Sequence, residues 1–334
     1  MKAYEIQEFG VEKLALVETE RPKPGKNDVL INFRAASLNY RDLMMINGWY
    51  NPKLKMPLVP FSDGAGEIVE VGENVSKWKA GDRVMPIFMQ GWINGGITYE
   101  KGKTALGGDL DGCLREFGAF HEESIVAIPE HLSFEEAATL PCAAVTAWHA
   151  LKISGSLKEG ETVLLLGTGG VSIFALQFAK HMNAEIIITS SSDEKLGKAD
   201  ILGADRLINY RENPDWDEAV SVFTAKRGVD HVVEVGGAGT LQKSLSSVRV
   251  GGHIAVIGVL ARKGDFDPVP ILMKSVRLQG IYVGSRAMFE EMNEFISEHL
   301  IKPVVDRTFE FGDVTDALKH MESGSHFGKI VVRY

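Results

Sequence analysis

The chain has 334 residues, of which 45% are hydrophobic, and this is enough for two domains with sizeable cores. Its formal net charge is −9 and its basic residues do not cluster, so we expect neither nucleic acid nor a membrane surface as the main partner. The two cysteines, Cys113 and Cys142, lack CxxC spacing, which argues against a disulfide framework; together with an N-terminus that lacks a secretory apolar core, this favours the cytoplasm.

Residues 1–130 contain short strand-like segments. Val29, Ile31 and Phe33 alternate along one segment, and further apolar segments follow at 68–71 and 84–87. This pattern predicts a β-rich barrel or sandwich. Seven glycines between positions 91 and 112 predict a long loop, which either borders a cleft or is a surface loop without a role.

The pattern changes at Ser133. Ser133 and Glu136 match a capping box ahead of an apolar helix that we expect to continue past Pro141 toward Lys152. From there, strands near positions 162, 185, 206, 230, 252 and 276 are separated by helices near 170, 194, 215 and 240. This alternation predicts a mostly parallel, doubly wound sheet in an α/β domain.

The C-terminal region is predicted to contain helices at 287–299 and 314–321 and a final strand at 328–333. We expect this tail to return to the first domain. The predicted domains are therefore residues 1–130 with 287–334, and residues 131–286.

An apolar strand runs into a glycine turn and then a helix within residues 162–180. Gly167 permits a tight bend, Gly169 lets a pyrophosphate approach the main chain, and Gly170 and Val171 open a helix whose N-terminus favours anions. Ser172 replaces the usual third glycine but is still small. The uncharged run 162–179 contains this turn, so we interpret it as strand and helix, not as a membrane span. The turn predicts a dinucleotide site.

The next strand ends in serines where many nucleotide-binding units carry an acid. An acid there binds the ribose 2′-hydroxyl, whereas hydroxyls with a cation accept a 2′-phosphate. Ser190, Ser191 and Lys195 fit the second case, Tyr210 can face the adenine ribose, and Asp193 is the one discordant charge. We therefore predict NADP(H) in preference to NAD(H).

Several motifs together resemble the medium-chain dehydrogenase/reductase superfamily, on its zinc-free quinone-reductase and enoyl-reductase side. They are AASLNYRD (35–42), DGAGEIVEVG (63–72), WKAGDRV (78–84), EEAATLPCAAVTAWHAL (135–151), LLGTGGVS (165–172), LGADRLINY (202–210) and GKIVV (328–332). The resemblance covers essentially the whole chain. It implies a GroES-like catalytic domain built from both chain ends, a central Rossmann domain and a cleft between them.

The resemblance also bears on metal binding. A catalytic zinc needs three protein ligands. The first ligand of zinc-dependent relatives is a cysteine in a segment that here reads SLNY (37–40), and the second is a histidine where this chain has Ser62 before Asp63. Only Cys142 matches a ligand position, and the four-cysteine structural lobe is reduced to Cys113. We therefore expect no metal, and a substrate more electrophilic than a simple ketone.

The resemblance assigns two catalytic residues. Asn39 would hydrogen-bond the substrate carbonyl, and Tyr50 would donate a proton to the enolate carbon or phenolate oxygen. Tyr40 and Asp42 lie beside them in sequence and would orient the pair. The structural alternatives are that Asn39 caps a strand end and that Tyr50 is a half-buried loop aromatic.

Further coenzyme contacts also follow from the resemblance and from strand ends. Thr146 matches a position near the nicotinamide in relatives, and the fourth and fifth strands of the doubly wound sheet end at Val235 and Gly236, and at Gly258 and Val259. Ligands of parallel sheets lie beyond such carboxyl ends. The alternative is that these are simple turn residues.

Three functions remain open. The preferred one is an NADPH-dependent reductase of quinones or conjugated enones and enals. The alternatives are a zinc-type alcohol dehydrogenase and a non-catalytic nucleotide-binding protein. The expected partners are a small electrophilic acceptor and further copies of the chain, as a homodimer or homotetramer, since residues 277–283 resemble an edge strand that relatives pair across a two-fold axis.

Overall fold

The structure is a computed structural model that describes residues 1–258, 260–261, 264 and 266–334. The chain forms two compact units. The first comprises Met1–Val145 together with Gly284–Tyr334, and the second comprises Thr146–Val283. The domain limits expected from the sequence stay a prediction, because compactness alone does not show where independently folding domains end.

The first unit is built on strands. These are β1 Lys2–Glu5, β2 Ala15–Glu18, β3 Asp28–Ser37, β4 Asp63–Val71, β5 Arg83–Pro86, β6 Phe117–His121, β7 Ile125–Ala127, β14 Val305–Glu310 and β15 Lys329–Arg333. A seven-stranded sheet has the order β14-β15-β3-β4-β5-β7, β6 also pairs with β3, and β1 and β2 form a separate pair. The β-rich first part predicted from alternation is confirmed.

Apolar residues of β3 form part of the hydrophobic core of the first unit. Val29, Ile31 and Phe33 are fully buried and pack with Ile68 of β4 and Phe120 of β6. The intervening Leu30 is buried as well, so both faces of this strand are covered. A period-2 pattern therefore identified the strand, although its polar face is limited to the partly exposed Asn32 and the exposed Arg34.

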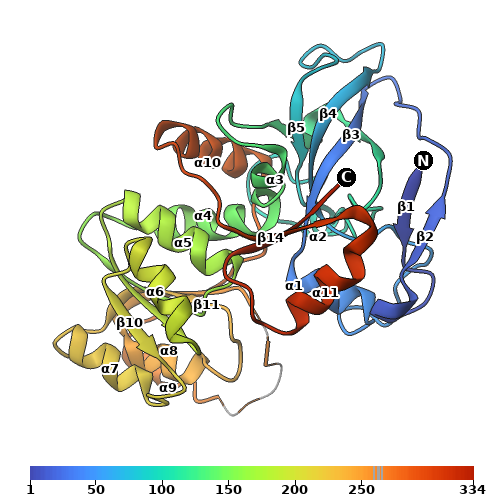
Figure 1. The fold of residues 1–334 in the computed structure, drawn as a ribbon. Helices are drawn as coiled ribbons and strands as arrows, with labels where there is room; N and C mark the ends of the chain where they lie inside the picture. The colour runs from blue at the N-terminus through green and yellow to red at the C-terminus, as the bar shows by residue number, and fades with distance from the viewer. Residues whose placement is uncertain (259, 262–263, 265) are drawn as a thin grey trace. The chain divides into compact units, whose positions relative to one another are not determined.

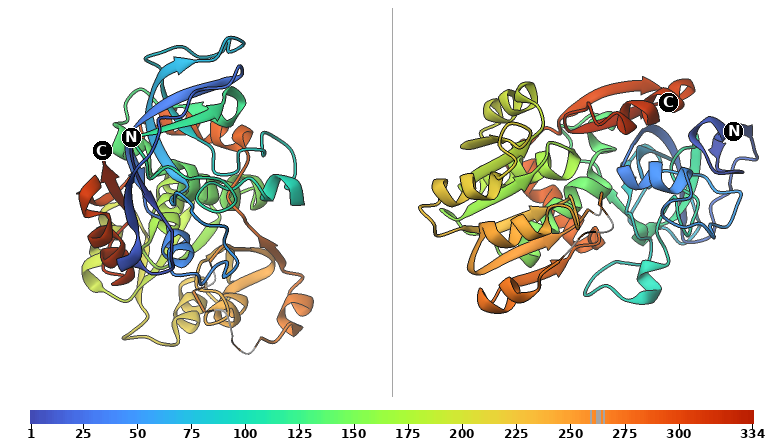
Figure 2. Two further views of the ribbon diagram at one scale, coloured as in Figure 1. Left: turned by 90° about the vertical axis from the view of Figure 1, so that its right-hand side faces the viewer. Right: turned by 90° about the horizontal axis from the view of Figure 1, so that it is seen from below.

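The C-terminal strand of the chain joins this sheet beside a strand of the N-terminal part. β15 runs antiparallel to β3, with Val331 opposite Ser37 and Val332 opposite Ala36, so the red C-terminal strand lies beside blue N-terminal strands in Figure 2. The return of the tail to the first domain is confirmed. Strand β14 was not expected from the sequence, and the terminal helix packs against both β14 and β15.

The helices of the first unit are short. They are η1 Val11–Lys13, α1 Tyr40–Ile46, α2 Tyr99–Gly102, η2 Glu122–Ser124, α3 Phe134–Ala137, η3 Leu140–Ala144, α10 Arg286–Glu298, η5 Phe311–Asp313 and α11 Val314–Glu322. Helix α2 interrupts the glycine-rich stretch that was expected to be a single long loop. None of the helices in the described ranges combines the length and apolarity that a membrane crossing requires.

The helical run that starts at Ser133 differs from the single helix expected. The capping box is present, because Ser133 Oγ accepts from Glu136 N at 3.1 Å and Glu136 Oε2 accepts from Ser133 N at 2.8 Å. Beyond α3, however, the chain forms the π-helical turn η3, the short α4 Val145–Trp148 and a second π-helical turn, η4 His149–Ser154. Pro141 lacks an N–H for the regular ladder, which accounts for the first break.

The second unit is a doubly wound α/β domain, as predicted. Its strands are β8 Thr162–Leu166, β9 Glu185–Ser190, β10 Arg206–Asn209, β11 Val229–Glu234, β12 Val248–Val256 and β13 Arg277–Gly280. All of them run parallel in the order β10-β9-β8-β11-β12-β13. The last strand ends at Gly280, three residues before the expected end.

Helices cover both faces of this parallel sheet (Figure 1). They are α5 Gly170–His181, α6 Asp193–Ile201, α7 Trp216–Phe223, α8 Leu241–Ser247 and α9 Val269–Met273. Trp216 of α7 and Leu245 of α8 pack on Leu164 and Val232 of the sheet. The strand order reverses between β9 and β11 on either side of β8, so the carboxyl end of β8 is the expected place for a ligand.

Candidate functional site

The glycine turn lies between β8 and α5 and has the geometry of a phosphate cradle. Gly167 has φ +71° and donates its N–H to Thr189 Oγ1 at 3.2 Å. A Cβ added at Gly167 or Gly169 would meet no atom within 4 Å, so the space above the turn is open to a ligand. Gly170 and Val171 begin α5, and first-turn N–H groups have no helical acceptor. The turn therefore fits a pyrophosphate.

Ser172 explains why a third glycine is not needed. Its side chain is buried and its Oγ donates to Leu166 O at 2.7 Å, at the end of β8. The serine thus ties the helix to the strand where a larger residue would push them apart.

The serine-rich end of β9 lies next to the end of β10. Asn209 is in register with Ser190, and Tyr210 N donates to Ser190 O at 2.9 Å, so the exposed Tyr210 lies beside Ser190 and Ser191. Lys195 is in the first turn of α6. Asp193, the discordant acid, accepts from Asn209 Nδ2 at 2.7 Å, so this hydrogen bond partly satisfies its charge within the domain.

The ends of β11 and β12 approach each other closely. A Cβ at Gly258 would lie 2.1 Å from Val235 O, and one at Gly236 would lie 2.3 Å from Thr240 Oγ1, so both positions require glycine for packing. Val259 lies outside the described residues. Thr146 is buried in α4. Val235, Gly236 and Gly258 follow the carboxyl ends of β11 and β12, at the edge of the sheet that also carries the glycine turn, as expected for parallel strands.

Glu234 organises this edge and was missed by the sequence reasoning. The carboxylate is fully buried, and its Oε1 accepts from Gly236 N at 2.7 Å, Gly237 N at 3.0 Å and Thr240 Oγ1 at 2.6 Å. Ser244 Oγ donates to the other oxygen. An acid at a strand end, with two glycines after a single intervening valine, was the available signal, and it indicates a carboxylate that shapes the turn.

The first unit contains a buried polar group that we call the Lys329 cluster, consisting of Asn39, Ser62, Asp63 and Lys329. Lys329 is 4% exposed, and its ammonium donates to Asn39 Oδ1 at 2.6 Å and Leu38 O at 2.7 Å. The same nitrogen lies 3.8 Å from Asp63 Oδ2. Asn39 Nδ2 donates to Ser62 Oγ at 3.4 Å, and Ser62 Oγ donates to Asp63 Oδ1 at 2.7 Å. Each of these four side chains therefore has a hydrogen bond or a charge contact with another of the four.

Asp42 supports the cluster from helix α1. Its Oδ2 accepts from Asn39 N at 2.8 Å, so it fixes the main chain of Asn39, while its role in orienting Asn39 and Tyr50 as a pair stays a prediction. Burial raises the pKa of Asp42 to about 7, although Arg41 at 3.8 Å opposes the rise. Burial also raises the pKa of Asp63, against the opposing charge of Lys329. Each buried carboxyl therefore has a cation nearby, Arg41 for Asp42 and Lys329 for Asp63.

Tyr50 is separate from Asn39. Asn39 caps the start of α1 and Tyr50 follows its end, and no hydrogen bond joins the two side chains among the described residues. Tyr50 is 43% exposed, and the Arg41 guanidinium lies 5.8 Å from the centre of its ring. Arg41 thus lies between Tyr50 and Asp42, the carboxylate that binds Asn39 N, and it also contacts Phe88. The catalytic roles of Asn39 and Tyr50 stay predictions.

The residues at the three zinc-ligand positions do not fit a divalent metal. The amide oxygen of Asn39 is occupied by a buried ammonium, which would repel a metal cation. Burial and the nearby Asp63 raise the pKa of the Cys142 thiol well above its usual value, and one thiol is too few ligands for a zinc site. Within the part of the chain that the structure describes, no three His, Cys, Asp or Glu side chains are grouped for a metal.

Comparison with known proteins matches both units. Residues 25–130 match the alcohol dehydrogenase GroES-like domain, and residues 170–298 match the zinc-binding dehydrogenase family. A zinc-type alcohol dehydrogenase-like protein of Schizosaccharomyces pombe is 43% identical over 97% of this chain and 96% of its own length. An acryloyl-coenzyme A reductase of Metallosphaera sedula is 31% identical over 94% and 95%. The crystal structure of a putative alcohol dehydrogenase from Sinorhizobium meliloti 1021 is 40% identical, with a TM-score of 0.94 over 100% of this chain and 98% of that one.

Proposed function

Because the chain belongs to the medium-chain dehydrogenase/reductase superfamily, whose members are oxidoreductases that use a nicotinamide coenzyme, we propose that it is an NADPH-dependent, metal-independent reductase of conjugated enones, enals or quinones. The observation that carries the proposal is the Lys329 cluster, in which a buried ammonium binds the amide oxygen of Asn39, within the segment that supplies the first zinc ligand in zinc-dependent relatives.

Electrophilic acceptors suit such a site. Without a Lewis acid, a simple ketone oxygen is poorly polarised, whereas an enone or quinone already accepts a hydride and needs only hydrogen bonds to the oxygen that becomes negative. The nicotinamide supplies the hydride when it is bound. The relative named acryloyl-coenzyme A reductase has a conjugated substrate in its name, which supports this class of acceptor.

Asn39 is the residue proposed to bind the acceptor oxygen. Its contact with Ser62 Oγ is long, at 3.4 Å, and is therefore the weakest in the cluster and the one that a carbonyl oxygen would displace. The ammonium on Asn39 Oδ1 withdraws electron density from the amide and strengthens its N–H as a donor. Tyr50, exposed beside Arg41, is the proposed proton donor.

The coenzyme preference rests on Ser190, Ser191, Lys195 and Tyr210. No acid ends β9, and Asp193 is engaged by Asn209, so the end of the strand offers hydroxyls and a nearby cation to a 2′-phosphate. These features support NADPH over NADH.

We also propose self-association through β13, as a homodimer or homotetramer. This strand ends the parallel sheet, and all four of its residues are exposed. An unpaired edge of this kind favours pairing with a second copy. Sedimentation equilibrium tests this point, and a monomer at micromolar concentration would contradict it.

The experiment for the main proposal follows coenzyme oxidation by purified protein with a panel of a quinone, an enone, an enal and a simple ketone, with and without a chelator. We expect chelator-resistant turnover of conjugated acceptors with NADPH and a sub-stoichiometric metal content. Asn39→Ala should lower kcat by about 10²- to 10³-fold. Asn47→Ala, which changes the asparagine at the other end of α1, is the matched control and should keep full activity.

Two results would replace the proposal. Bound stoichiometric metal with chelator-sensitive oxidation of alcohols would make the chain a zinc-type alcohol dehydrogenase, in line with the names of two relatives above, a zinc-type alcohol dehydrogenase-like protein and a putative alcohol dehydrogenase. Coenzyme binding without turnover of any acceptor would make it a non-catalytic nucleotide-binding protein.

A further inference from the structure

Arg41 is a buried arginine that has no carboxylate at hydrogen-bond distance. Its side chain is 10% exposed, and among the described residues its guanidinium makes a single hydrogen bond, from Nη1 to Leu106 O at 3.0 Å. The one acid within 4 Å in the described structure is Asp42, whose Oδ1 lies 3.8 Å from Nη1, too far for a hydrogen bond. A buried charge is costly unless it is paired and hydrogen-bonded, so this guanidinium has unused binding capacity.

Asp42 does not cancel the charge of Arg41. Burial raises the pKa of Asp42 to about 7, against the opposing effect of Arg41, so near neutral pH a large fraction of the carboxyl is protonated. Its Oδ2 accepts from Asn39 N, and its buried Oδ1 has no hydrogen-bond partner among the described residues. Asn39 and Arg41 therefore lie beside the same carboxyl, and Arg41 keeps much of its positive charge.

Two aromatic rings hold the guanidinium in place. It lies 4.8 Å from the centre of the Phe88 ring and 5.8 Å from the centre of the Tyr50 ring. Contacts of this kind attract a cation without neutralising it. Because Tyr50 is the proposed proton donor, the uncompensated charge lies beside a residue of the proposed reaction.

The terminal nitrogen Nη2 of Arg41 is open to a ligand. It has no partner among the described residues, and it is not fully enclosed, in contrast to Nε, which is buried without a partner. Gly108 keeps the space next to it free, since an added Cβ there would lie 2.3 Å from Nη2. A negative oxygen of a ligand can therefore accept from this nitrogen.

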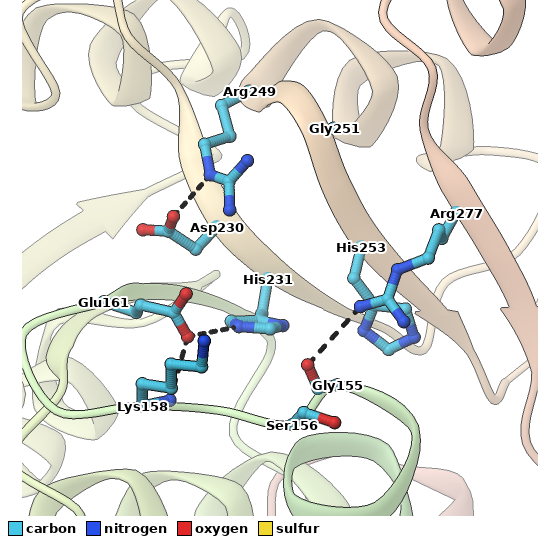
Figure 3. A pocket seen from close by; sticks show the side chains of 10 residues that line it. All are labelled: Gly155, Ser156, Lys158, Glu161, Asp230, His231, Arg249, Gly251, His253 and Arg277. Atoms are coloured by element: carbon cyan, nitrogen blue, oxygen red, sulfur yellow. Dashed lines mark hydrogen bonds and ion pairs between the residues drawn. The ribbon is translucent and has the colours of Figure 1, made fainter.

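A polar cavity in the other unit shows how buried arginines are satisfied elsewhere. It has a volume of about 210 Å³ and lies at the amino edge of the parallel sheet, where Arg277 begins β13 (Figure 3). Arg249 Nε donates to Asp230, and both terminal nitrogens of Arg277 donate to main-chain carbonyls, at 3.3 and 3.4 Å. These arginines bond to groups of the protein itself, whereas Nη2 of Arg41 is left for an external acceptor.

We propose that Arg41 binds a carboxylate of the acceptor, so that the preferred substrate is a conjugated enone or enal that also carries a carboxylate. This substrate class rests on the proposed function and narrows it. Asn39 binds the ketone or aldehyde oxygen, and Arg41 Nη2 donates to the carboxylate. One cation with one free N–H group matches a singly charged anion, whereas a phosphate dianion would need further cations. The carbon–carbon double bond takes one hydride from the coenzyme and one proton from Tyr50, which gives the saturated acid and the oxidised coenzyme.

The test compares trans-4-oxo-2-pentenoate with its methyl ester at saturating NADPH and near neutral pH. The ester is the more electrophilic of the two, so a preference for the acid has to come from the protein. We expect kcat/KM for the acid to exceed that for the ester by at least about tenfold, chiefly through a lower KM. Arg41→Gln should bring this ratio to one or below. Gly108→Ala fills the space beside Nη2 without removing the charge, and it should also lower the ratio.

Arg34→Gln is the matched control, because it removes an arginine of β3 that is 47% exposed, and it should leave the ratio unchanged. Circular dichroism and NADPH affinity check that each variant is folded. A wild-type ratio of one or below, or an unchanged ratio in Arg41→Gln, would overturn the proposal, and reduction of the ester would still leave the reductase function in place. If Arg41→Gln does not fold, an unchanged ratio in Gly108→Ala overturns the proposal instead.

A lack of turnover with both compounds would contradict the proposed function, and binding then decides the role of Arg41. Calorimetric titration of the protein with saturating NADP⁺ compares 4-oxopentanoate, the saturated product, with its methyl ester. Binding of the acid that is at least about tenfold tighter in the wild type, but not in Arg41→Gln, would support the carboxylate site without the reaction. Equal affinity for the acid and the ester would overturn it.

Discussion

Replacing Lys329 by methionine tests the Lys329 cluster directly. Methionine keeps much of the length of the side chain and removes the charge. Leu38 O and Asn39 Oδ1 each lose a donor, and Asp63 loses the cation 3.8 Å away. Breaking a buried pair by removing one partner costs roughly 3–5 kcal/mol, which is a large part of the ~5–15 kcal/mol that stabilises a typical domain.

The cost of Lys329→Met should depend on pH. Without the ammonium, the pKa of Asp63, already raised by burial, rises further. A carboxyl whose pKa is higher in the native state than in the unfolded chain stabilises at low pH, and that stability is lost as pH rises through the native value. The variant should therefore lose stability mainly on the alkaline side, with a deficit near ~3 kcal/mol at pH 8 and a smaller one at pH 5.

Urea unfolding followed by circular dichroism at both pH values measures this deficit. Lys319→Met, which removes an exposed lysine paired with Glu12, is the control and should stay within about 0.5 kcal/mol of the wild type. Adding Asp63→Asn to Lys329→Met should recover part of the loss, because it removes the unpaired charge. A Lys329→Met protein with wild-type midpoints at both pH values would refute the reasoning that the ammonium compensates Asp63.

Three further predictions concern single residues. Burial raises the pKa of Asp42 from 3.8 to about 7, so the protonated carboxyl stabilises the native state fully below about pH 4, and this stability is lost as pH rises through 7. In Asp42→Asn, the urea midpoint of unfolding should therefore depend less on pH between pH 5 and 8 than in the wild type. An unchanged pH dependence would contradict this. Ser191→Asp should raise the Kd for NADPH by at least about tenfold and spare NADH, as measured by coenzyme fluorescence. Tyr50→Phe should lower kcat by about 10²-fold without changing coenzyme affinity, and unchanged kcat for every acceptor would remove the proton-donor role.

Much of the fold was predictable because local patterns and burial agree. The run from Thr162 to Leu166 is buried at every position, and the turn after it contains the glycine with positive φ that the geometry needs. Strand β14 was missed because its side chains are largely exposed and include Asp306, Arg307 and Glu310, so it lacks the apolar alternation of a half-buried strand. Its place depends on pairing with β15, which local sequence does not reveal.

The candidate sites were predictable only where a motif is contiguous. Lys329 was within a recognised motif, yet its role depends on a hydrogen bond to Asn39 across 290 positions of sequence. The polar cavity at the amino edge of the parallel sheet combines a loop with three strands, and its lining residues come together only because β11, β12 and β13 are neighbours in one sheet. Long-range pairing of this kind carries no local periodicity, so sequence patterns identified the elements but not these contacts.

The Lys329 cluster should respond little to salt. Lys329 is buried, so mobile ions do not reach it and the donor strength of Asn39 should be nearly independent of ionic strength. Enone turnover at saturating NADPH should therefore change little as the sodium chloride concentration rises. A steep decline of this turnover with salt would mean that the Lys329 cluster is open to water, contrary to its burial.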